Sequence, residues 1–418
     1  MLSQQTIKSE EKGNINSQES PDIQSQVPVI LAYGFRPFFL LAPLYLSIST
    51  LLWGLFWSGL LPFSFLSNPL EWHLYENLFG VTSAMMIGFI LTAVPEFYKN
   101  VKPVAGKTLL YLVIFWILGR ISFWLIDYIG IFAVAIINIP LLLWVVLLII
   151  KPILTDPQHR HISLIIMFIV ISLIHIWFFM AKLDWVDTNP LSILKASIGA
   201  FMILVLLALR RISMVVVNYW LDKKNISATY VARPPRYNIA IICLILYTFT
   251  EFLYPNNSIL IWLAFAVMAA VLNIINDFFL ENSIFIQPFI WPLFSIFIML
   301  ALGYGLIGLD YLIPEIYHIN DFRHLITLGA LGIAFYMVLI IVAHFHTGRD
   351  LAPNPWIGIG ASLILCASII RGLVIPFIDG SESWAYLTSA IMWTLPFIGY
   401  LILYGKWLVQ PRADGLSG

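Results

Sequence analysis

Long apolar runs recur from Phe38 almost to the end of the chain, and they constrain the fold more than any other feature. Each run is close to the ~20 residues that a helix needs to cross ~30 Å of hydrocarbon. The runs lack the alternation of membrane barrel strands, and a bilayer accepts only helices or closed barrels. We therefore predict an all-α polytopic membrane protein, a bundle of about twelve transmembrane helices over residues 38–60, 72–96, 108–128, 129–150, 162–182, 193–220, 238–254, 258–280, 286–309, 321–343, 355–376 and 383–409.

The composition agrees with this fold class. Of the 418 residues, 61% are hydrophobic and only 11% are charged, whereas soluble domains carry about 25% charged residues. The 22 basic residues balance 22 acidic ones, which argues against a nucleic-acid partner because such proteins need a basic surface. The two cysteines, Cys243 and Cys366, both lie in apolar runs and are interpreted as packing residues.

The two ends of the chain are polar. Residues 1–29 contain almost nothing to bury, so they are predicted to form a disordered cytoplasmic tail. The start is not a signal peptide, because it lacks the short apolar core and the cleavage site. We expect a single transmembrane domain over residues 30–410 and a short C-terminal tail over 411–418.

Basic residues predict the orientation in the membrane. With twelve spans, both termini and every second loop lie on one side, and that side collects 17 of the 22 basic residues. By the positive-inside rule this side is cytoplasmic. The other five basic residues lie on the opposite side or within spans, and they are Arg120, Lys182, Lys195, Arg323 and Arg371.

Ionisable side chains at membrane depth are costly and mark function by default. On this topology an outer group comes from four different spans and converges on one depth, as a metal or haem site in a bundle requires. Its members are His73, Glu76, His175, Arg323, His324 and Arg371.

A second group lies at the cytoplasmic end of the tenth span. His346 follows His324 by 22 residues, roughly 33 Å along a helix, so the two cannot ligate one metal. An inner site near His346 would have Arg36, Arg211 and Arg349 within reach. These arginines would either hold anionic groups or extend to the lipid headgroups.

The second predicted span also carries a row of small residues. Asn77, Gly80, Ala84 and Gly88 follow His73 on one side of the helix. Such a row favours close approach of another helix, and it would also accommodate a flat macrocycle against the backbone.

Five short motifs in order resemble one known family. They are GFRPFF (Gly34 to Phe39), WHLYENLFG (Trp72 to Gly80), GFILTAVP (Gly88 to Pro95), RHLITLGALG (Arg323 to Gly332) and HTGR (His346 to Arg349). This combination resembles the NnrS family, and the resemblance covers most of the chain beyond residue 30. It implies a bacterial inner-membrane protein of twelve helices that contains haem and copper and acts in the nitric oxide response.

The resemblance also implies ligands. Matched position by position, it implies candidate ligands at His73, Glu76, His324 and His346, with His175 as a further candidate. The family's second-helix motif usually has the order His-x-His-Glu, and this chain has Tyr75 at the second histidine. A neutral phenol is a poor ligand for copper or ferrous haem. Either one metal is lost in this chain, or its ligands are completed by other residues. Haem b is the expected centre, and copper is a second candidate.

The specific prediction for the outer site is that His73 and His324 are ligands of one bound haem. Arg323 and Arg371, at the same level, would pair with its propionates. Glu76 would accept the free ring N–H of a neighbouring histidine and so orient it.

Three classes of function fit these residues. The first is a haem or copper protein that helps the cell to tolerate nitric oxide, with nitric oxide as a ligand and membrane lipid as its surroundings. The second is a membrane oxidoreductase acting on nitric oxide or a quinol. The third is a small-molecule transporter, although we find no internal duplication of the kind that inverted-repeat transporters often show.

Overall fold

The computed structural model describes residues 27–62, 66–98, 100–280, 285, 287–313, 318–378, 380 and 382–416. Most of the predicted N-terminal tail therefore lies outside the described residues, as does Lys99 from the basic count. The described elements are the 3₁₀ helix η2 (Val29–Leu31), the π-helices η3 (Glu76–Thr82), η5 (Leu325–Leu331) and η6 (Ile370–Val374), and the α-helices α1 (Phe35–Trp57), α2 (Pro69–Tyr75), α3 (Ser83–Phe97), α4 (Gly106–Trp124), α5 (Ile126–Ile129), α6 (Ile131–Leu154), α7 (Ile162–Lys182), α8 (Pro190–Lys223), α9 (Pro234–Leu253), α10 (Ile259–Ile275), α11 (Ile290–Leu312), α12 (Ile319–His324), α13 (Gly332–Phe345), α14 (Pro355–Ile369), α15 (Ile375–Phe377) and α16 (Glu382–Leu408).

The all-α polytopic fold class is confirmed. Among the described residues, 11 helical runs are long and apolar enough to cross a membrane, and each coincides with a predicted span. The twelfth predicted span, 258–280, corresponds to α10, which has 17 residues. That length gives about 26 Å, at the lower limit for a span. Helix α10 packs against α9 and α11, so it belongs to the bundle.

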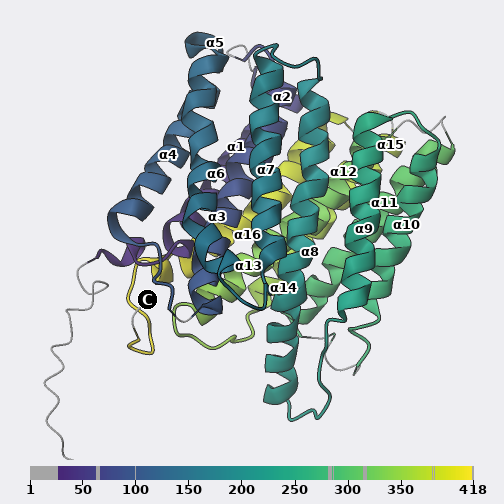
Figure 1. The fold of residues 1–418 in the computed structure, drawn as a ribbon. Helices are drawn as coiled ribbons and strands as arrows, with labels where there is room; N and C mark the ends of the chain where they lie inside the picture. Colours follow the sequence, from purple (N-terminus) through teal and green to yellow (C-terminus); the bar gives the residue numbers. More distant parts are fainter. Residues whose placement is uncertain are drawn as a thin grey trace, which may run out of the picture.

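The first long helix of the bundle, α1, packs against the last one, α16. Helix α16 also packs against α14. In Figure 1, α2, α12 and α15 lie in the upper half of the bundle, and the C-terminus lies at its lower end. The segments that carry His73, Arg323 and His324 therefore lie in the same half of the molecule.

Three helices start at an Asn-Pro pair, which explains their boundaries. In each pair the asparagine side chain accepts a hydrogen bond from a backbone N–H of the first turn, and proline needs no such partner at the first helical position. These starts are Asn68-Pro69 in α2, Asn189-Pro190 in α8 and Asn354-Pro355 in α14. Two of them fix the first turns of helices that line the cavity described below.

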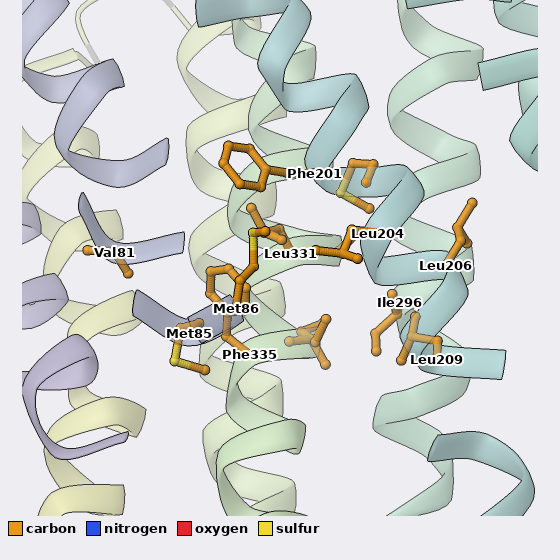
Figure 2. Close-up of a cluster of buried hydrophobic side chains, with 14 of the residues drawn as sticks. Val81, Met85, Met86, Phe201, Leu204, Leu206, Leu209, Ile296, Leu331 and Phe335 are labelled. Atoms are coloured by element: carbon orange, nitrogen blue, oxygen red, sulfur yellow. The ribbon is translucent and has the colours of Figure 1, made fainter. Parts of the chain in front are cut away.

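A packed apolar layer lies between α3, α8, α11 and α13. Figure 2 shows Met85 and Met86 of α3 in this layer, with Phe201 and Leu204 of α8 and Phe335 of α13. All of these side chains are buried. Phe335 also lines the cavity, so the packed layer borders it.

Candidate functional site

The structure brings His73 and His324 to one cavity of about 270 Å³. This volume lies just below the range of about 300–1,000 Å³ that is common for small-molecule sites. The lining is largely apolar and includes the rings of Trp53, Phe335 and Trp393. Its polar side chains are Thr50, His73, Asn77, Thr82, Lys195, Asn320, Arg323, His324, Thr327, Arg371, Tyr386 and Ser389.

Three π-helical segments border this cavity. Helix η3 begins three residues after His73, η5 begins directly after His324, and η6 contains Arg371. Each of them contributes side chains to the cavity lining. The π-helical turn is rare and concentrates at functional sites. Its occurrence in three helices around one cavity identifies this cavity as the candidate functional site. These π-helical segments could not be predicted from the amino-acid sequence.

The ring of His73 is held by a tryptophan and an asparagine. It lies parallel to the Trp53 ring, with 4.1 Å between centroids and 7° between planes. The Asn77 amide donates a hydrogen bond to the His73 carbonyl at 2.8 Å, and its nitrogen lies 3.3 Å from Nδ1 of His73. An amide N–H facing Nδ1 places the ring proton of neutral His73 on Nε2.

His324 has the opposite arrangement. Its Nδ1 lies 2.8 Å from the backbone carbonyl oxygen of Asn320. A carbonyl oxygen only accepts, so Nδ1 carries the proton and the lone pair of neutral His324 lies on Nε2. This is how metal-bound histidines are usually oriented by their surroundings. His324 is therefore prepared as a ligand, whereas His73 would first have to change its tautomer.

The two predicted arginines also line the cavity, and each already has a carboxylate partner. Arg323 donates to Glu251 through both terminal nitrogens, and Arg371 pairs with Asp321. The Arg371 guanidinium also lies 4.6 Å from the ring centroid of Tyr386. The carboxylate partners were missed because they lie 72 and 50 residues away in the sequence.

Glu76 is not among the residues that line the cavity, and its contacts lie toward α4. Its carboxylate accepts a hydrogen bond from Arg120 at 2.5 Å and another from Tyr45 at 2.7 Å. Arg120 in turn donates to Asn138 at 2.7 Å. Since the buried Arg120 needs a counter-charge in the bundle, it takes the carboxylate that we had expected to orient a histidine.

Two glycines of the small-residue row lie in close contacts with neighbouring side chains. A side chain at Gly80 would meet Arg120 and Glu76 within 2.6 Å, and one at Gly88 would meet Phe39 within 2.9 Å. These two glycines therefore allow close packing, the first of the two interpretations of the row.

His175 lies next to Tyr75, and neither residue lines the cavity. Its Nε2 is 2.9 Å from the Tyr75 hydroxyl, and its ring stacks on Phe79 with 4.4 Å between centroids. The residue that departs from the family motif is thus the hydrogen-bond partner of a candidate ligand.

His346 belongs to the opposite end of the bundle. Its Nδ1 lies 3.1 Å from a carboxylate oxygen of Glu96, and Arg412 donates to its backbone carbonyl at 3.2 Å. Hydrogen bonds from Arg412 also lower the pKa of the Asp414 carboxyl to about 2. The hydrogen bond from Arg412 to His346 connects the C-terminal segment to the end of α13.

The arginines of this inner end have local partners as well. Arg36 is buried and donates to the carbonyls of Leu408 and Gln410, at 2.8 and 3.0 Å, where α16 ends. The guanidinium of Arg211 lies 4.1 Å from the Phe97 ring, and that of Arg349 lies 4.6 Å from the Trp407 ring. For Arg36 this is a helix-capping role, which we had not predicted.

The donor set fits haem better than a bare metal ion. Among the described residues, no group of three or more His, Cys, Asp or Glu side chains is placed to hold a metal. A copper ion would require several such donors, whereas haem supplies its own four nitrogens and needs one or two axial ligands from the protein. Two histidines on one mostly apolar cavity meet that requirement.

Comparison with known proteins identifies the family. Neither the curated proteins nor the solved structures include a match to this chain. The family model described as NnrS protein matches residues 29–412, which covers all twelve helical spans and every motif noted above. The chain belongs to the NnrS family.

Proposed function

We propose that this membrane protein binds haem b in the cavity that His73 and His324 line, and that it acts in the nitric oxide response of a bacterial inner membrane. One observation supports the haem site above all. His324 and His73 line the same cavity from different helices, and the contact of Nδ1 with the Asn320 carbonyl leaves the lone pair of neutral His324 on Nε2. Membership of the NnrS family supports the nitric oxide response in general.

The two histidines of the cavity have different roles in this proposal. His324 would be the first residue to hold the haem, because its Nδ1–H is already bound to the Asn320 carbonyl. His73 would be the second ligand or would donate its Nε2–H to a bound gas, with Trp53 holding its ring. Haem iron would supply the position at which nitric oxide binds. The apolar lining would keep bulk water away from that position.

Copper remains a second candidate with less support. Tyr75 is hydrogen-bonded to Nε2 of His175, which is one of the two ring nitrogens through which a histidine can bind a metal. Turnover of nitric oxide or a quinol is an alternative function at the same cavity, and transport of a small molecule through this cavity is another. The presence of an absorbing cofactor separates the first two functions from the third.

The test is a reduced-minus-oxidised visible spectrum of the purified full-length protein and of two variants. We expect a haem b spectrum for the wild type. His324→Ala should lose the haem, and His73→Ala should lose it or shift the Soret band. His159→Ala, in an exposed loop, is the control. Unchanged haem content in both cavity variants would contradict the proposed site and make His346 the leading ligand.

A further inference from the structure

A second, smaller cavity adjoins the first. It has a volume of about 240 Å³ and is lined by residues that include Glu251, Asn256 and Tyr311. Lys195, Asn320 and Arg323 line both cavities. These three side chains therefore form a shared wall, with the histidine cavity on one side and the smaller cavity on the other.

The charges along this wall do not balance. Three cations line the histidine cavity, and two of them have carboxylate partners: Arg323 binds Glu251 and Arg371 binds Asp321. Lys195 has neither a hydrogen bond nor an ion pair with any described residue. The positive charge of Lys195 thus has no carboxylate partner among the described residues.

Glu251 already accepts hydrogen bonds from three other side chains. One of its oxygens accepts from Tyr247 at 2.7 Å, from Tyr311 at 3.4 Å and from Arg323, and the other accepts from Arg323 at 3.2 Å. Lys195 meanwhile faces the positive charge of Arg323 as well as the negative charge of Glu251. Its ammonium is therefore only partly compensated.

Arg323 adds a second unused donor at the same place. Its Nε–H is buried and has no hydrogen-bond partner among the described residues. A buried donor without an acceptor is costly, and so is a partly buried charge without a counter-charge. One negatively charged acceptor at the wall would offset both costs.

We propose that Lys195 and Arg323 bind an oxyanion at this wall. The fitting chemistry is a small group with one negative charge and two or more acceptor oxygens, such as nitrite, nitrate or a carboxylate. The source is either a free inorganic anion that enters through the smaller cavity or a carboxylate of a molecule bound in the histidine cavity. The proposal does not depend on haem binding.

The test is the unfolding midpoint of the purified full-length protein, titrated with sodium nitrate against sodium chloride at equal ionic strength. We expect nitrate to raise the midpoint of the wild type more than chloride does. Lys195→Met should weaken nitrate binding by at least about tenfold, the equivalent of one hydrogen bond to a charged group. Lys195→Arg should retain binding, and Lys224→Met, an exposed lysine, is the matched control.

A repeat of the titration after addition of haem separates the two sources. If nitrate still binds in the presence of haem, the wall binds a free inorganic anion. If haem displaces nitrate, the wall binds a carboxylate of the molecule in the histidine cavity. An equal effect of nitrate and chloride on the wild type, or an unchanged nitrate response in Lys195→Met, would overturn the proposal. The first titration is carried out on protein from which any haem has been removed, so its result is independent of whether the haem proposal holds.

Discussion

The hydroxyl oxygen of Tyr75 lies 2.9 Å from Nε2 of His175, and both side chains are buried. The Tyr75 ring stacks on Phe123 with 3.7 Å between centroids. Tyr75 therefore completes a packed, hydrogen-bonded pair, and His175 uses in that pair one of its two possible metal-binding nitrogens. This relationship predicts a structural role for the tyrosine.

Tyr75→Phe should reduce the free energy of unfolding by about 1–3 kcal/mol, because it leaves a buried histidine nitrogen without its partner. The haem spectrum should not change, since neither residue lines the cavity. Thermal unfolding in detergent and the visible spectrum check the two outcomes. Tyr128→Phe, at a ring that is 74% exposed, is the control. A lost Soret band in Tyr75→Phe would assign this pair to the cofactor site instead.

The buried pair of Glu76 and Arg120 leads to a second prediction. Glu76→Gln should destabilise the protein by about 3–5 kcal/mol, because it leaves the Arg120 charge uncompensated in the bundle. Adding Arg120→Leu to this variant should recover part of the loss. The double-mutant cycle, measured by thermal unfolding, gives the coupling between them. Additive losses would show that the two charges act independently.

The sequence predicted the spans well because each requires a long apolar run, which is a local property. It also placed His73 and His324 at one depth, since both begin a span at the same end. The π-helical turns could not be predicted, because a π turn depends on contacts between helices and leaves no periodic pattern. The Glu76–Arg120 pair was missed for a related reason. Its members lie 44 residues apart, and only the packing of α4 beside η3 brings them together.

Arg36 joins the first helix to the last one, so its loss should affect the whole bundle. Arg36→Met should remove the hydrogen bonds to the carbonyls at the end of α16 and lower the free energy of unfolding by at least about 2 kcal/mol. Lys406→Met, an exposed residue of α16, should have little effect. Thermal unfolding compares the two variants, and equal midpoints would contradict a capping role.

The predicted orientation is tested by reporter fusions. A fusion after Asn68, in the loop between α1 and α2, should behave as periplasmic, because the basic residues gather on the other side. A fusion after Lys224, which follows α8, should behave as cytoplasmic. Cytoplasmic behaviour at Asn68 would overturn the orientation, and with it the assignment of the histidine cavity to the outer half.

The stack between Trp53 and His73 leads to the last prediction. With 7° between planes and 4.1 Å between centroids, the tryptophan restricts rotation of the imidazole. Trp53→Leu keeps an apolar side chain and removes the flat surface, so the His73 ring should sample several orientations.

We expect Trp53→Leu to weaken haem binding and to broaden or shift the Soret band, since ordering the ring would then oppose binding. Trp53→Phe retains an aromatic face and should restore most of the wild-type spectrum. Trp185→Leu, at a side chain that is 65% exposed, is the control. A haem titration monitored by absorbance measures all three variants. If Trp53→Leu bound haem like the wild type, the stack would have no part in orienting His73, and the haem would depend on His324 alone.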